Sequence, residues 1–217
     1  MVINMNCKGA IFDMDGLLFD TERVFQQTWQ EIAREHDIVL NDTFIRTVSG
    51  TSGERLCQVI EDYYHVDNAA ELVEDCMKRV REKLAAHVPM KDGVFEVLDF
   101  FKQKNVKMAV ASSSRIEQIE ANLKISGIRD YFAAVVSGTE VSSGKPEPDI
   151  FLYAAEKIGC SPKECYVFED SENGIKAGYA AGCVTVMVPD LIEASEEILP
   201  YCSMVCSSLL DFFNELC

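Results

Sequence analysis

The feature that most constrains this chain is a series of short, almost continuous apolar runs separated by longer segments with helical periodicity. The runs are GAIF at 9–12, KMAVA at 107–111, FAAVV at 132–136, CYVF at 165–168 and CVTVMV at 183–188. Short runs without polar alternation are typical of strands buried on both faces, as in a parallel sheet. Because helical segments alternate with them, we predict an α/β fold with a doubly wound, Rossmann-like parallel sheet.

The segments between the runs carry both helical periodicity and signals for where helices begin. Apolar residues recur at spacings of three and four, as in the set Val94, Val97, Leu98 and Phe101. Ser114 with Glu117, and Ser161 with Glu164, match the pattern of a capping box. These pairs therefore predict helix starts directly after them.

One long stretch, residues 21–89, interrupts the alternation of strands and helices. It contains three apolar faces at helical spacing and no convincing strand. The faces are Phe25, Trp29, Ile32 and Ala33; Leu56, Val59, Ile60 and Tyr63; and Leu72, Val73, Cys76, Val80 and Leu84. We therefore predict an α/β core domain of residues 1–20 and 90–217, with a helical domain of residues 21–89 inserted after the first strand.

The charge, apolar content and cysteine spacing indicate which partners the protein can bind and in which cellular compartment it is expected. The 217 residues carry a formal net charge of −16, which repels nucleic acid over most of the surface. No apolar run approaches the roughly 20 residues that a membrane helix requires, and the N-terminus does not resemble a signal peptide. The nine cysteines lack regular spacing and are interpreted as reduced thiols. We expect a cytoplasmic protein without membrane or nucleic-acid partners, and a monomer because no long apolar surface stripe is evident.

Polar side chains follow several of the predicted strands. Asp13 and Asp15 end the first run, serines occupy positions 112–114, Lys145 lies after the third run, and an acidic pair stands at 169–170. In a parallel sheet the carboxyl ends of all strands lie along one edge, where ligands bind. Each cluster alone could be a turn, a helix cap or a solvated loop. Together and in this order they predict one catalytic cleft.

The chemistry of these residue types points to phosphoryl transfer. Carboxylates crowded at one edge repel one another, and a divalent cation with a preference for hard oxygen ligands, such as Mg²⁺, relieves that repulsion. A cation, a lysine and a hydroxyl would surround a small oxyanion with positive charge and hydrogen-bond donors. A carboxylate nucleophile in such a site can form an aspartyl-phosphate intermediate.

Four segments then resemble, in order, the motifs of the haloacid dehalogenase-like (HAD) hydrolases. They are FDMDGLLFDTE from Phe12, VASSS from Val110, SGKPEPDIF from Ser143 and VFEDSENGI from Val167. The resemblance spans essentially the whole chain and is strongest to the phosphatase and β-phosphoglucomutase branch with a helical cap. It implies a HAD core with an inserted cap domain, and a Mg²⁺-dependent phosphatase acting on a small phosphorylated metabolite such as a sugar phosphate.

The resemblance also implies roles for individual residues in the transfer of the phosphoryl group. Asp13 would be the nucleophile that attacks phosphorus, and Asp15 would be the general acid and base. Ser112 and Lys145 would hold the phosphoryl oxygens. Ser113 would lie nearby and contribute to substrate binding.

The same resemblance implies a metal site and a function for the insertion. Mg²⁺ would be held by the carboxylates of Asp13 and Asp170 and by the backbone carbonyl of Asp15, with Glu169 binding directly or through water. The insertion would close over the cleft and read the leaving group, with hinges at residues 19–22 and 88–90. The loop at residues 49–54, which includes Gly50, is a candidate substrate-binding element.

At two positions this sequence differs from the pattern of the mutase branch, and these differences bear on whether the protein is a phosphatase or a mutase. Phe25 stands where mutases carry a histidine, and Gly53 stands near the position of an arginine that anchors a second phosphate. A phosphosugar mutase is therefore the alternative, and transfer to water is favoured. A non-enzymatic phospho-aspartate receiver is less consistent with the sequence, because the acidic pair at 169–170 comes late in the chain and a helical segment follows the first strand.

Overall fold

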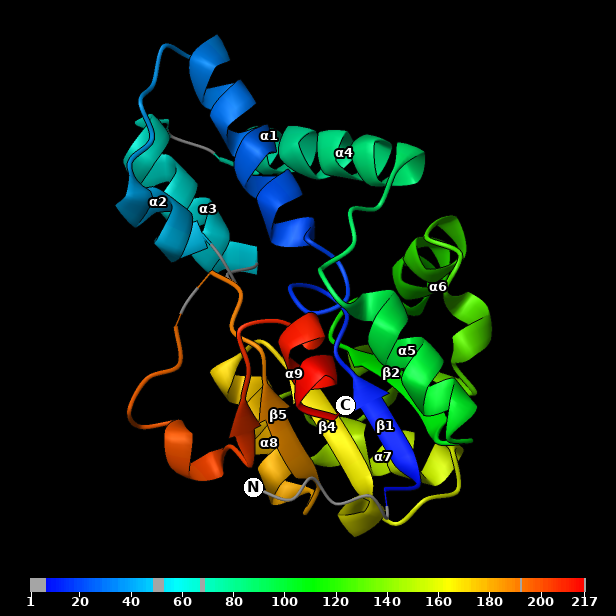
Figure 1. Ribbon diagram of the computed structural model, residues 1–217. Coiled ribbons are helices and arrows are strands. Elements are labelled where there is room, and N and C mark those ends of the chain that lie inside the picture. Colours follow the sequence, from blue (N-terminus) through cyan, green and yellow to red (C-terminus); the bar gives the residue numbers. More distant parts are fainter. Residues whose placement is uncertain (1–6, 49–52, 67–68, 192, 217) are drawn as a thin grey trace. The chain divides into compact units, whose positions relative to one another are not determined.

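The computed structural model describes residues 7–48, 53–66, 69–191 and 193–216. By its internal contacts the chain divides into two compact units. Met1–Phe19 and Pro89–Cys217 form the first, called the core unit here, and Asp20–Val88 form the second, called the helical unit. Each is described by itself (Figure 1).

The core unit is built on a six-stranded parallel sheet with the order β3-β2-β1-β4-β5-β6, which confirms the predicted α/β fold. The strands are β1 (Gly9–Phe12), β2 (Lys107–Ser112), β3 (Ala134–Ser137), β4 (Cys165–Glu169), β5 (Val184–Met187) and β6 (Met204–Val205). Along the chain, β2 and β3 are added on one side of β1, and β4 then pairs with β1 on its other side. The topological switch point therefore lies between β1 and β4, where Phe12 pairs with Phe168.

Helices cover both faces of the sheet, because alternate strand residues point to opposite sides. They are α5 (Val94–Gln103), α6 (Ile116–Ile125), α7 (Asp149–Lys157), α8 (Glu172–Ala180) and α9 (Leu209–Leu216). Ile11 and Val167 share a buried cluster with residues of α7 and α8. Their neighbours Phe12 and Phe168 stack at 4.8 Å on the other face, where both rings contact Phe101 of α5 and Phe168 also contacts Phe212 of α9.

The structure corrects several details of the sequence interpretation. The edge strand β6 and helix α9 were not predicted, and β3 begins at Ala134. The two predicted capping boxes are wrong. Helix α6 has Arg115 as its N-cap without a side-chain hydrogen bond, and Ser161 precedes only a short 3₁₀ turn, again without a side-chain cap. The side chain of Ser114 is instead used in the site described below.

The helical unit contains α1 (Thr21–Glu35), α2 (Asp42–Val48), α3 (Gly53–Tyr64) and α4 (Ala70–Ala86). Its interior includes an aromatic group of Trp29, Phe44 and Tyr64, whose ring centroids lie 5.9–6.1 Å apart. The Tyr64 hydroxyl donates to the Trp29 carbonyl at 2.9 Å, so its polar end is satisfied inside the unit. In the described part of the chain, no helix has the length and apolar character needed to cross a membrane.

Candidate active site

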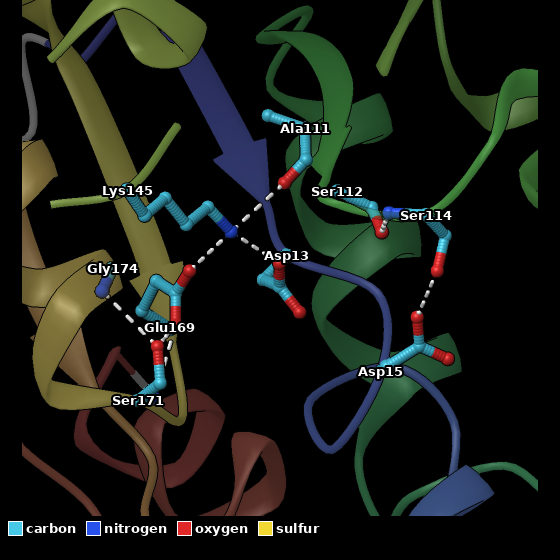
Figure 2. A network of polar contacts seen from close by, with 9 residues as sticks. All are labelled: Asp13, Asp15, Ala111, Ser112, Ser114, Lys145, Glu169, Ser171 and Gly174. Carbon is cyan, nitrogen blue, oxygen red and sulfur yellow. Dashed lines mark hydrogen bonds and ion pairs between the residues drawn. The ribbon is translucent and has the colours of Figure 1, made fainter. Parts of the chain in front are cut away.

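The carboxyl ends of β1 and β4 bring Asp13 and Glu169 together around the side chain of Lys145 (Figure 2). Asp13 follows β1 and donates its N–H to the Phe168 carbonyl at 3.0 Å, which fixes the backbone beside β4. Lys145 Nζ contacts Asp13 Oδ1, lies 2.5 Å from Glu169 Oε1 and donates to the Ala111 carbonyl at 3.3 Å. The side chains of Lys145, Asp13 and Glu169 are 8%, 10% and 0% exposed, so water screens these charges weakly.

Burial and crowding shift the proton affinities of the charged groups. Burial, reinforced by the charges of Glu169 and Asp15, raises the pKa of Asp13 to about 7 against the opposing effect of Lys145. Burial opposes the charged form of Lys145, but the carboxylates of Asp13 and Glu169 outweigh it and raise its pKa. The ammonium group of Lys145 is therefore charged at neutral pH, and its partners are Asp13, Glu169 and the Ala111 carbonyl.

Glu169 is held from the side opposite Lys145 by the start of α8. Its Oε2 accepts hydrogen bonds from the N–H of Ser171 at 3.0 Å and from the hydroxyl of Ser171 at 2.9 Å. The same hydroxyl accepts from the N–H of Gly174 at 3.0 Å and so caps the helix. A Cβ on Gly174 would stand 1.9 Å from the Glu169 carboxylate, so only glycine fits there. Ser171 and Gly174 thus contact the site; both lie in the VFEDSENGI segment, but no role in the site was predicted for either from the sequence.

Asp15 lies apart from the lysine cluster and faces the serine turn after β2. Ser114 Oγ donates to Asp15 Oδ2 at 2.8 Å, and Figure 2 shows the Asp15 carboxylate pointing toward Ser114 rather than toward Lys145. The Ser114 N–H donates to Ser112 Oγ at 3.1 Å, and its carbonyl accepts from the buried Ser137 hydroxyl at 2.6 Å. Ser114 is therefore positioned from both sides, a function that sequence reasoning missed when it assigned this residue to a cap.

The remaining predicted residues fall in different places. Ser112 is buried at the end of β2, and Ser113 is exposed beside it. Asp170 follows Glu169, and its Oδ2 is 2.3 Å from the point where a Cβ on Gly16 would stand. Gly16 has a φ of +85°, a left-handed conformation that suits glycine. The predicted substrate-binding residue Gly50 lies outside the described residues.

The residues present fit a divalent cation. Asp13, Glu169 and Asp170 bring three carboxylates to one sheet edge, and Lys145 balances only part of their charge. Burial, together with the charges of Glu169 and Asp13, raises the pKa of Asp170 well above its usual range. Within the described ranges no three acidic, His or Cys side chains already converge as metal ligands. The ammonium of Lys145 forms ion pairs with both Asp13 and Glu169. The oxygen donors are of the kind that Mg²⁺ prefers.

Comparison with known proteins identifies the family of this chain. The family model of the haloacid dehalogenase-like hydrolases matches residues 10–188. A phosphorylated carbohydrates phosphatase from Thermotoga maritima is 31% identical over 179 residues, covering 81% of this chain and 82% of the relative. The "Probable pseudouridine-5'-phosphatase" of Drosophila melanogaster is 33% identical over 214 residues, covering 95% of this chain and 91% of the relative.

The fold has a similar counterpart among solved structures. That of a proposed β-phosphoglucomutase from Thermotoga maritima has a TM-score of 0.82 at 25% identity, covering 96% of this chain and 98% of that chain. The family match extends from the first apolar strand, just before Asp13, to the end of β5 and so includes all the polar clusters described above. The chain belongs to the haloacid dehalogenase-like hydrolases, in the branch that contains phosphosugar phosphatases and β-phosphoglucomutases.

Proposed function

We propose that this protein is a Mg²⁺-dependent phosphomonoester hydrolase that acts on a small phosphorylated metabolite of the sugar-phosphate class through an aspartyl-phosphate intermediate. The observation that carries the proposal is the buried contact of Asp13 with Lys145 at the carboxyl edge of β1 and β4. A carboxylate with one oxygen on a charged lysine is both oriented and placed beside a binding group for an anion.

Asp13 is the nucleophile in this proposal. One of its carboxylate oxygens attacks phosphorus, a phosphorus–oxygen bond forms, and the bond to the leaving oxygen breaks. Lys145 and the hydroxyl of Ser112 hold the phosphoryl oxygens during this transfer. Because burial raises the pKa of Asp13 to about 7, its reactive ionised form depends on positive charge close by.

Asp15 moves the protons. It donates a proton to the leaving oxygen as the ester bond breaks, and then takes a proton from the water that attacks the phospho-aspartate. Phosphate leaves and Asp13 is regenerated. The hydrogen bond from Ser114 Oγ at 2.8 Å orients the Asp15 carboxylate between these steps and keeps it apart from Asp13.

The carboxylates of Asp13 and Asp170 and the backbone carbonyl of Asp15 would hold Mg²⁺, with Glu169 close by. When bound, Mg²⁺ supplies positive charge that stabilises the transferring phosphoryl group. The helical unit would act as the cap that reads the leaving group. The named activities of the two relatives, on phosphorylated carbohydrates and on pseudouridine 5'-phosphate, both involve a phosphorylated sugar unit, which supports this substrate class.

A panel of phosphorylated metabolites tests the proposal, with released phosphate measured in Mg²⁺ and in excess EDTA. The panel includes hexose and pentose phosphates, nucleoside 5'-phosphates and phosphorylated amino acids. We expect Mg²⁺-dependent release that is greatest for phosphorylated sugars. No release from any member of the panel would contradict a hydrolase.

A second arm separates hydrolysis from the mutase alternative. The enzyme is incubated with β-glucose 1-phosphate and a glucose bisphosphate activator, and both isomerisation and phosphate release are followed. We expect release without efficient isomerisation, consistent with Phe25 in α1 where mutases carry a histidine. Isomerisation without release would replace the proposal by the mutase.

A further inference from the structure

One buried acid near the site has no role in the proposed mechanism. Asp190 lies in the segment after β5, and its side chain is only 8% exposed. Its Oδ1 forms an ion pair with Lys91 Nζ. Its Oδ2 is buried and has no hydrogen-bond partner among the described residues. A buried carboxylate oxygen without a donor is unfavourable unless something else satisfies it.

This oxygen is directed toward the acidic edge of the sheet. Asp190 Oδ2 lies 3.4 Å from the point where a Cβ on Gly16 would stand, and Asp170 Oδ2 lies 2.3 Å from the same point. Gly16 directly follows Asp15, whose carbonyl is one of the oxygens proposed for the cation. The ends of β4 and β5 are joined by a hydrogen bond of 2.7 Å from the Val188 N–H to the Glu169 carbonyl. Asp170 and Asp190 therefore flank one glycine from two neighbouring strands.

Lys91 fixes the orientation of Asp190 without satisfying both of its oxygens. The Lys91 backbone N–H donates to the Leu18 carbonyl at 3.0 Å, so the lysine stands on the turn that follows Asp15. Its side chain is 23% exposed, more than that of Asp190. The pair thus leaves the buried oxygen of Asp190 directed at Gly16 and Asp170, while its positive end is nearer to water.

We propose that Asp190 is a further acidic residue of the cation site, outside the ligands themselves. This inference rests on the proposed function, because it concerns the same Mg²⁺. Asp190 strengthens binding through its negative charge and by accepting hydrogen bonds from water around the cation, and Lys91 limits the directions in which its carboxylate points.

Calorimetric titration of the full chain with Mg²⁺, without substrate, tests the assignment. Asp190→Asn keeps the shape and removes the charge, and we expect its Mg²⁺ dissociation constant to rise about 10-fold, as for residues that support metal ligands. Glu197→Gln is the matched control, since Glu197 is an exposed acid in the same connecting segment and loses the same charge. We expect wild-type affinity for that control. An unchanged dissociation constant in Asp190→Asn would overturn the inference.

Lys91→Met separates an electrostatic contribution from a merely structural one. If the pair only braced the turn, removing either partner would weaken Mg²⁺ binding equally, and that result would also overturn the inference. We expect Lys91→Met to bind Mg²⁺ at least as tightly as wild type, because the site becomes more negative. Thermal melts in EDTA verify that each variant is folded. A wild-type protein that does not bind Mg²⁺ would count against the proposed function itself, whereas normal wild-type binding with unaffected variants would count against Asp190 alone.

Discussion

The two units of this protein contain similar ion pairs in very different surroundings. In the core unit, Lys145 meets Asp13 and Glu169 with all three side chains at most 10% exposed. In the helical unit, Arg79 contacts Glu35 at 2.6 Å with side chains 29% and 53% exposed, and Lys83 contacts Glu31 at 2.7 Å with side chains 35% and 43% exposed. The distances alone do not distinguish the two settings.

The surroundings decide what these charges can do. Exposed ion pairs are screened by water and typically contribute about 0–1 kcal/mol, whereas removing one partner of a buried pair costs roughly 3–5 kcal/mol. Only the buried cluster can polarise or bind a reacting anion strongly. The core unit therefore supplies the chemistry in our proposal, and the helical unit is held together mainly by apolar and aromatic packing around Trp29 and Phe44.

The largest expected effect comes from the nucleophile. Asp13→Asn should lower kcat by at least ~10⁴-fold, because an amide cannot form the phospho-enzyme. Asp75→Asn in the helical unit, where Asp75 contacts Arg79 at 2.8 Å, is the matched control and should retain wild-type turnover. Steady-state phosphate release measures both. Substantial activity in Asp13→Asn would show that Asp13 is not the nucleophile and that the buried cluster does not carry out the reaction.

The next largest effect is a loss of kcat/KM on removing a buried lysine, compared with removing a more exposed one. Lys145→Met should lower kcat/KM by roughly 10²–10³-fold, since it removes a charged donor to the phosphoryl oxygens. Lys83→Met removes a lysine that donates to Glu31 at 2.7 Å in the helical unit, and it should leave kcat/KM unchanged. Kinetics at saturating Mg²⁺, with circular dichroism to verify folding, compares them. Equal losses in the two variants would break the contrast between buried and exposed cations.

The raised pKa of Asp13 predicts a pH dependence of stability in the metal-free protein. Its folded-state pKa of about 7 lies above the unfolded value, so its ionised form destabilises the fold. The stability that the protonated carboxyl provides is complete below pH ~4 and is lost as the pH rises through about 7.

Asp13→Asn cannot ionise, so its unfolding free energy relative to that of wild type should rise by about 1–3 kcal/mol from pH 5 to pH 8 in EDTA, on top of a pH-independent cost of removing a partner of Lys145. Urea unfolding at each pH measures the difference, in which the titration of other groups largely cancels. A constant difference across this range would show that Lys145 fully compensates the charge of Asp13.

The hydroxyl of Ser114 should have a smaller effect. A hydrogen bond to a charged group is worth about 1.5–3 kcal/mol, so Ser114→Ala should lower kcat by about 10-fold or more. KM should change little, because Ser114 contacts Asp15 rather than the phosphoryl group in this proposal. Ser114→Thr keeps the hydroxyl and should restore most of kcat. A loss confined to KM would instead assign Ser114 to substrate binding.

The smallest effect is expected at the surface of the helical unit. Glu35→Gln removes the carboxylate that Arg79 contacts through both terminal nitrogens, at 2.6 and 2.7 Å. Because the pair is half exposed, the unfolding free energy should fall by less than ~1 kcal/mol and turnover should not change. Thermal unfolding at low and high salt measures the contribution. A fall in unfolding free energy as large as that expected for a buried pair would contradict the proposed difference between the ion pairs of the two units.

The fold and the main polar clusters could be predicted from sequence because they depend on local patterns. Continuous apolar runs identified β1 to β5, and the polar residues at the ends of those runs or in the loops after them were predicted to lie at one sheet edge. The strand β6 has only two residues, Met204–Val205, and is too short to give such a pattern. Ser114 was misassigned because a serine three residues before a glutamate has the same sequence pattern whether or not it caps a helix.

The sequence by itself determined the alternation of strands and helices, the inserted helical segment and the kinds of side chain at the strand ends. Only the tertiary structure decided which of those side chains meet. Lys145 and Asp13 are 132 residues apart, and Ser114 and Asp15 are 99 apart, so their contacts depend on strand order and on the loops after the strands. The same holds for Asp190, whose buried oxygen is meaningful only beside Gly16 and Asp170. Local periodicity reports burial, whereas catalytic geometry requires atoms from distant segments to lie within a few ångströms.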